Sequence, residues 1–116
     1  MGKWETFVVE GKTVVPKLTI RKGGQIGLNM AAVQRFSLKK YKYVIFRINQ
    51  DEQKLGLKFS NDEKERGIRK VRIVQGGISL AAKSFVLSYS LDQIKEKRLI
   101  CEWDQAEEMV IAKYTK

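Results

Sequence analysis

Residues 17–29 read KLTIRKGGQIGLN, and residues 69–81 read RKVRIVQGGISLA. Both stretches open with a basic segment, continue through a Gly-Gly pair, and end in a short piece with apolar residues at every second position. Alternation with a period of two is typical of half-buried β-strands, and a glycine pair between such strands indicates a turn. Each stretch therefore predicts a strand, a turn and a second strand.

The segments that follow the two stretches also occur in the same order. Asn29 is expected to cap a short helix over residues 30–36, and a second helix is expected over residues 81–89. In both halves a Ser-Leu pair, a strand, a polar turn and a return strand come next, which predicts an internal repeat. The four predicted strands cover residues 43–48, 55–59, 98–103 and 109–114.

The chain of 116 residues is expected to form one domain, residues 1–116, that is mainly β with short helices. Residues 17–59 form the first repeat, residues 60–68 a charged connector, and residues 69–116 the second repeat. Residues 1–16 are predicted to add an N-terminal hairpin. Each half alone is too small to bury much apolar surface. The two halves should therefore pack around a pseudo-two-fold axis.

The net charge of +10 is distributed unevenly along the chain. Residues 1–60 carry twelve basic and four acidic side chains, whereas residues 61–116 carry eleven and nine. A basic excess of this size in a short domain attracts polyanions by its long-range field. Nucleic acid is the expected partner. An acidic protein partner and a surface that is basic for solubility alone stay open as alternatives.

The candidate nucleic-acid-binding residues are the basic side chains that precede the two glycine pairs, with weaker candidates on the helices and in the segment before the third strand. Lys and Arg neutralise phosphates and release counterions, and Arg also reads guanine through two hydrogen bonds. If the halves are related by a pseudo-two-fold axis, the two strand groups should share one face and straddle a duplex. The alternative is that these charges protect exposed strand edges from aggregation. The candidates are Arg21, Lys22, Arg35, Lys39, Lys40, Lys42, Arg69, Lys70, Arg72 and Lys83.

Two tyrosines interleave with the cluster Lys39, Lys40 and Lys42. Tyr41 and Tyr43 beside these charges suit the stacking of exposed bases, which favours a single-stranded nucleic acid. An equally good interpretation is that alternate residues of the coming strand simply point inward.

Catalysis has little support in this sequence. The chain has no histidine, so the commonest general base and metal ligand are missing. Cys101 has no cysteine or histidine partner for a zinc site and is expected to be a buried, unreactive thiol. No enzyme activity, metal or cofactor is therefore expected. No apolar run is long enough for a membrane span, and residues 1–20 do not resemble a signal peptide, so a cytoplasmic location is expected.

The repeat unit resembles the AbrB-like, or swapped-hairpin, family of DNA-binding regulators and antitoxin domains. The resemblance rests on residues 17–59 and, more loosely, on residues 69–114, which together cover about three quarters of the chain. The proline that opens the helix in the family is Asn29 in the first unit and Ala81 in the second.

The resemblance implies a swapped-hairpin β-barrel, here with both units supplied by one chain, so a monomer or weak dimer is expected. It also implies duplex DNA binding through the basic first strand, as in a transcription regulator or a chromatin-like protein. An antitoxin or inhibitor that docks an acidic protein is the alternative from another class.

Overall fold

The computed structural model describes residues 15–116, and most of the hairpin predicted within residues 1–16 lies outside the described residues. The described chain is mainly β with short helices, as predicted. Two α-helices, α1 (Met30–Arg35) and α2 (Lys83–Ser88), are each followed by a 3-10 turn, η2 (Leu38–Lys40) and η3 (Leu91–Gln93). The strands are β1 (Lys17–Arg21), β2 (Gln25–Asn29), β3 (Tyr43–Asn49), β4 (Lys54–Ser60), β5 (Arg69–Lys70), β6 (Ile73–Val74), β7 (Gly77–Ala81), β8 (Arg98–Asp104) and β9 (Met109–Lys113).

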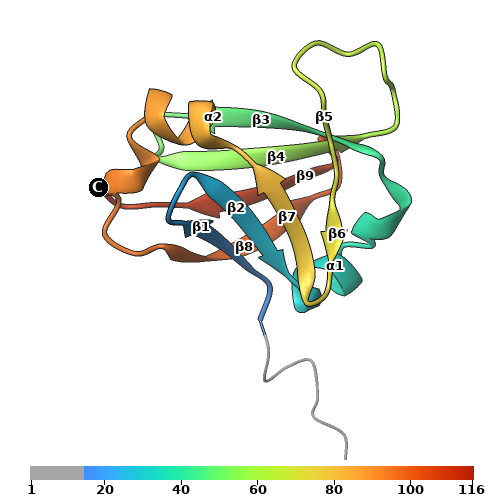
Figure 1. Ribbon diagram of the computed structural model, residues 1–116, viewed down its shortest axis with the longest axis horizontal. Coiled ribbons are helices and arrows are strands. Elements are labelled where there is room, and N and C mark those ends of the chain that lie inside the picture. The colour runs from blue at the N-terminus through green and yellow to red at the C-terminus, as the bar shows by residue number, and fades with distance from the viewer. Residues whose placement is uncertain (1–14) are drawn as a thin grey trace, which may run out of the picture.

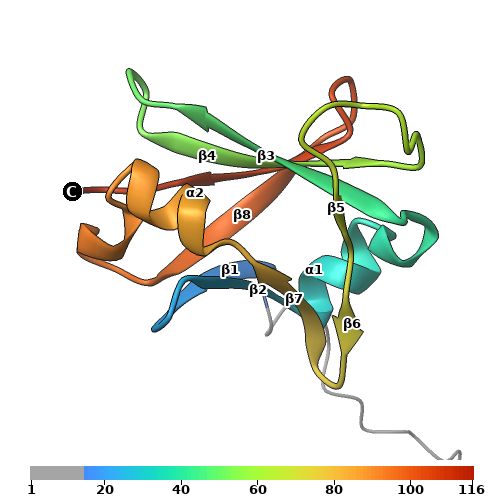
Figure 2. The same cartoon turned by 45° about the horizontal axis from the view of Figure 1, so that its top comes forward.

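All strand pairs are antiparallel, and together they form one sheet in the order β5-β3-β4-β9-β8-β1-β2-β7-β6. The sheet curls into a half-barrel with two facing layers (Figures 1 and 2). One layer contains β1, β2, β7 and β6, and the other contains β3, β4 and β9, with β8 joining them. The helices α1 and α2 lie at opposite ends of the curled sheet (Figure 2).

The core lies between the two layers because strands such as β1, β8 and β9 bury alternate side chains on one face. Leu18 and Leu28 face it from one layer, and Leu55 and Leu57 face it from the other, each no more than 3% exposed. The helices close the ends of this core with Val33 and Val86, and both side chains are buried. Burial of branched aliphatic side chains at this density is the main favourable term in the folding free energy.

Asn29 ends β2 and caps α1, as its position in the sequence predicted. Its Oδ1 accepts hydrogen bonds from Ala32 N at 3.0 Å and from Lys17 N at 3.0 Å. Its Nδ2 donates to Val15 O at 2.8 Å. One side chain therefore fixes the helix start and the entry of the chain into β1.

Two predicted elements differ from the structure. The second helix is shorter than expected because Ala81 pairs with Gln25 as the last residue of β7. The predicted basic strand over residues 69–74 is divided into β5 and β6, because β5 pairs with β3 whereas β6 pairs with β7. Val71 and Arg72 carry the chain from one layer to the other.

Two adjacent glycines where β6 turns into β7 provide a test of how closely β7 lies against β2. A Cβ on Gly77 would lie 1.8 Å from the carbonyl oxygen of Leu28, whereas a Cβ on Gly76 would meet nothing within 4 Å. Both have positive φ, so either alanine costs about 1–2 kcal/mol of backbone strain. We expect Gly77→Ala to cost at least about 3 kcal/mol of unfolding free energy, because β2 and β7 must also separate. Urea denaturation measures both variants, and equal losses would contradict the close approach.

Candidate nucleic-acid interface

The outward face of β8, β1, β2 and β7 carries one row of residues with an arginine at each end. Thr19 lies opposite Arg98 on one side and opposite Gly27 on the other. Gly27 in turn lies opposite Ser79, whose N–H donates to Arg72 O at 3.0 Å. The row therefore presents small side chains between two arginines that come from distant parts of the chain. We call this surface the Arg21 face, after the residue that lies across its centre.

Arg21 extends over the middle of this row because Gly27 has no side chain. A Cβ on Gly27 would lie 2.9 Å from Cζ of Arg21, so the guanidinium lies against the backbone of β2. A hollow of about 230 Å³ beside it is lined by Lys17, Arg21 and Arg98. Three cations thus surround a shallow depression with a floor of small residues.

A second hollow, of about 410 Å³, adjoins the Arg21 face where α2 meets the β1–β2 turn. Its apolar lining is Ile20, Val86 and Leu87. The contact is close: Ala82 N donates to Gly24 O at 3.0 Å, and a Cβ on Gly24 would lie 2.6 Å from Cα of Lys83. The charged side chains that line the hollow are Arg21, Lys22, Lys83, Lys97 and Asp92.

Lys97 is held in place at this hollow. Its Nζ donates to Asp92 O and to Ile94 O, each at 2.7 Å. Carbonyl oxygens satisfy its donors without neutralising its charge. The hollow therefore has four cationic side chains and one carboxylate in its lining, which makes the Arg21 face and its border a concentrated positive surface.

The structure brings together Arg21, Lys22, Lys83 and the exposed Arg72 from the predicted candidates. It adds Lys17, Lys97 and Arg98, which the sequence analysis missed. Lys17 alternates in phase with Arg21 along β1, so the sequence carried a signal for it. Lys97 and Arg98 reach this face through the pairing of β8 with β1, which no local pattern announces.

The other candidates lie elsewhere. Arg69 and Lys70 pair with β3 in the second layer, and Val71 N donates to Lys42 O at 2.9 Å. The guanidinium of Arg69 lies 5.4 Å from the ring centroid of Phe46. Lys39 and Lys40 line a separate hollow of about 370 Å³ near the end of α1, where Arg35 is the last residue. The connector contacts Lys40 and Lys42 through Asn61, and it carries three acidic and two basic side chains.

Tyr41 is not available for base stacking. Its ring is 7% exposed and packs against Phe59 and Trp103, with centroids 5.7 Å and 6.1 Å away. Its hydroxyl donates to Glu108 Oε2 at 2.7 Å. The alternative of an inward-pointing residue therefore holds for Tyr41, whereas Tyr43 is half-buried on β3.

Cys101 is buried in the core, and burial raises the pKa of its thiol to about 12. A thiol with so high a pKa is a poor nucleophile at neutral pH. Within residues 15–116, no group of three or more acidic or cysteine side chains is placed to hold a metal ion. No helix in the same part of the chain combines the length and apolar character that a membrane crossing requires.

Comparison of the chain with protein-family models, with curated proteins and with solved structures finds no match.

The Tyr41 contact predicts how stability depends on alkaline pH. Burial, with the Glu108 hydrogen bond and charge adding to it, raises the pKa of Tyr41 from 10.0 to about 12. Between pH 10 and 12 the unfolded chain loses this proton while the folded chain keeps it, so stability is fully present below pH 10 and falls as pH rises through this window. Burial of Cys101 acts in the same direction.

We expect Tyr41→Phe to lose about 1 kcal/mol at pH 8, because one hydrogen bond is removed. Its stability should then fall less between pH 9 and 11 than that of the unaltered protein. Urea unfolding across this pH range measures the difference. Parallel stability curves for the two proteins would show that Tyr41 is not the titrating group.

Proposed function

We propose that this protein binds duplex DNA through the Arg21 face. The observation that carries the proposal is the row Arg98, Thr19, Gly27, Ser79 and Arg72, in which two arginines flank small residues on one sheet surface. Lys17, Arg21, Lys22, Lys83 and Lys97 extend the positive charge around this row.

Small residues at the centre let a phosphate backbone approach the sheet closely, while cations at both ends meet phosphates on either side. The flanking arginines come from β8 and from the segment between β5 and β6. Two separated cationic rims suit a double-stranded polyanion better than a single carboxylate or phosphate. The net charge of +10 would also steer DNA towards the protein over a distance of about a Debye length.

A tandem swapped-hairpin architecture is part of this proposal, and the register of the two central strand pairs supports it. When the two halves are aligned, Gln25 is equivalent to Gly77 and Asn29 is equivalent to Ala81. In the β2–β7 ladder, Gln25 pairs with Ala81 and Asn29 pairs with Gly77. The ladder therefore maps onto itself, as it would around a two-fold axis between Gly27 and Ser79. The β4–β9 ladder does the same around the pair of Gly56 and Ile111.

Backbone conformation supports the same axis. Four non-glycine residues of the described chain have positive φ, and they occur as two equivalent pairs: Ser37 with Ser90, and Gln53 with Glu108, all between 51° and 54°. Each 3-10 turn thus begins after a serine in the same unusual conformation.

Reciprocal hydrogen bonds link the two units. Phe59 N donates to Glu108 O, and Tyr114 N donates to Gln53 O, each at 2.9 Å. The segment 69–74 pairs with β3 and β7 as β1 pairs with β8 and β2. This correspondence supports a barrel in which the second unit repeats the first. Regulation of transcription, or a chromatin-like packing role, is the function that such a duplex binder would serve.

The single-stranded alternative is weakened by the burial of Tyr41, which leaves Tyr43 without its partner for stacking. An antitoxin or inhibitor that docks an acidic protein would use the same cations. The DNA-binding titration below distinguishes the two functions, because such a protein would not bind duplex DNA.

The test is a fluorescence anisotropy titration of labelled duplex DNA, single-stranded DNA and RNA at several salt concentrations. Duplex binding should be strongest, with log K falling by about 0.9 for each phosphate contacted per unit of log salt concentration. Arg21→Ala, Arg72→Ala and Arg98→Ala should each cost on the order of 1 kcal/mol or more and make the salt slope shallower.

Lys64→Ala in the connector is the matched control, because it removes one exposed charge away from the Arg21 face. It should change duplex affinity little, and so should Tyr43→Ala. If Lys64→Ala and Arg21→Ala lost the same duplex affinity, the loss would follow from the lower net charge and not from the Arg21 face. Binding of folded Arg21→Ala, Arg72→Ala and Arg98→Ala at full affinity would refute the proposed face, and a flat salt dependence would refute nucleic acid as the partner.

A further inference from the structure

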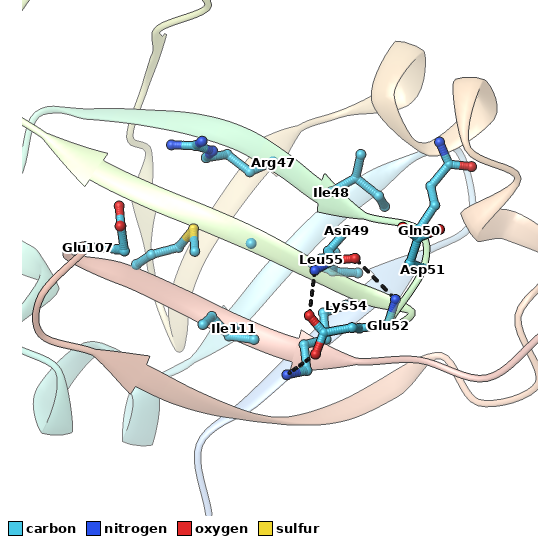
Figure 3. A pocket seen from close by; sticks show the side chains of 12 residues that line it. Arg47, Ile48, Asn49, Gln50, Asp51, Glu52, Lys54, Leu55, Glu107 and Ile111 are labelled. Carbon is cyan, nitrogen blue, oxygen red and sulfur yellow. Dashed lines mark hydrogen bonds and ion pairs between the residues drawn. The ribbon is translucent and has the colours of Figure 1, made fainter.

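The layer opposite the Arg21 face carries a second ordered row on its outward side. Arg47 on β3 lies opposite Gly56 on β4, Gly56 lies opposite Ile111 on β9, and Ile111 lies opposite Glu102 on β8. Read across four strands, the row is a cation, a position without a side chain, a large apolar side chain and a carboxylate. Arg47 and Ile111 lie on either side of β4 in Figure 3.

This face is hollowed at its centre, where apolar and polar side chains meet. A hollow of about 670 Å³ lies over β4, lined by Arg47, Gly56, Met109 and Ile111 among others. Ile100, two residues before Glu102 on β8, is 65% exposed. Met109 and Ile111 beside it are half-buried on the same outward face.

Neither end of the row is neutralised within the described chain. Arg47 and Glu102 are both exposed, and neither forms an ion pair within residues 15–116. The neighbouring cations differ in this respect, since Lys54 lies 3.4 Å from Glu52 and Lys58 lies 3.8 Å from Glu107.

We propose that this face docks a second copy of the same chain, with a two-fold axis that runs parallel to the strands between β4 and β9. Such an axis reverses the row, so that Arg47 lies over Glu102 of the second copy and Ile111 lies over Gly56 of the second copy. Both contacts occur twice. A row with this order of charge and volume is complementary to itself, as the interface of a symmetric dimer must be.

Met109 is the side chain that adjusts in this interface. Its Sδ lies 2.6 Å from the position of a Cβ on Gly56, so in the single chain it covers part of the space that Ile111 of a second copy would take. Methionine has three flexible side-chain torsions and repacks at low cost. Larger residues at position 56 would block both the Met109 contact and the docking.

The dimer is weak because its interface is small and its outer rows are less favourable. A face four strands wide and five residues long measures roughly 19 Å by 16 Å. In projection this is roughly 300 Å² per copy, below the roughly 800 Å² per partner of a stable complex. The same axis also sets Lys54 against Lys113 of the second copy, which opposes association. The curl of the sheet further confines close contact to the central strands β4 and β9, so only the long side chains of Arg47 and Glu102 extend the contact to the outer strands.

The dimer has a consequence for DNA that rests on the proposed function. The docking face is centred on β4 and β9 and the Arg21 face on β1 and β2, which lie in opposite layers of the curled sheet (Figure 2). A dimer joined through the β4–β9 face therefore presents two Arg21 faces in opposite directions. It would hold two duplexes, so the protein would bridge DNA at concentrations where it dimerises.

Sedimentation velocity over a range of protein concentrations, without DNA, tests the docking itself. The unaltered chain should shift reversibly from monomer to dimer, and Ile111→Asp should remain monomeric. Arg47→Glu and Glu102→Arg should each weaken dimerisation by about tenfold or more, since each creates two like-charge contacts. The double variant R47E/E102R should restore it, and Lys64→Ala should behave like the unaltered chain.

A chain that is monomeric at every concentration would overturn the proposal, and so would a double variant that is no better than either single variant. Circular dichroism and thermal unfolding show whether each variant is folded. If Ile111→Asp does not fold, the comparison of R47E/E102R with its two single variants still tests the docking.

Capture of a second labelled duplex on immobilised DNA then tests bridging. Ile111→Asp should bind duplex DNA but fail to capture the second one. Normal dimerisation without any duplex binding would refute the proposed function and leave the docking face intact.

Discussion

Two antiparallel ladders between segments about fifty residues apart hold this structure together. Residues 25–29 pair with residues 77–81, and residues 54–58 pair with residues 109–113. Each ladder joins a hairpin from the first half of the chain to a hairpin from the second, so neither half can bury its apolar face without the other. The single core between the layers exists because both ladders form, and every surface feature depends on the registers that they fix.

Glycines at the centres of these ladders determine what the outward faces can do. Gly27 leaves room for the guanidinium of Arg21 to lie flat on the sheet, and Gly56 leaves the hollow over β4. Because outward side chains of neighbouring strands stand about 5 Å apart, one missing side chain changes the shape of a whole row. The two faces are thus built alike but differ in charge: one is bordered by cations, and the other places a cation and a carboxylate at opposite ends.

The two halves also differ inside the molecule. Tyr41, which follows η2, donates a hydrogen bond from its hydroxyl to Glu108, whereas Ile94, which follows η3, is buried without a polar group. A polar link therefore ties the region after α1 to the β8–β9 turn on one side only. The connector adds a further difference, since it brings three acidic and two basic side chains to the layer that holds β3 and β4.

Alternation, turn chemistry and capping residues determined most of the elements, whereas the division of residues 69–74 into β5 and β6 depended on their two different partner strands. Leu18 and Ile20 with Lys17 and Thr19 between them specify a half-buried strand, and Asn29 specifies a helix start, because both signals act within a few residues along the chain. Only the tertiary structure decided which strands pair and which side chains meet across the sheet. Lys97 and Arg98 joined Arg21 because β8 pairs with β1, and Tyr41 turned inward because Glu108 and Trp103 reach it from the far end of the chain. Local sequence fixes which face of a strand is apolar, whereas pairing across long loops depends on the packing of the whole core and leaves no local signal.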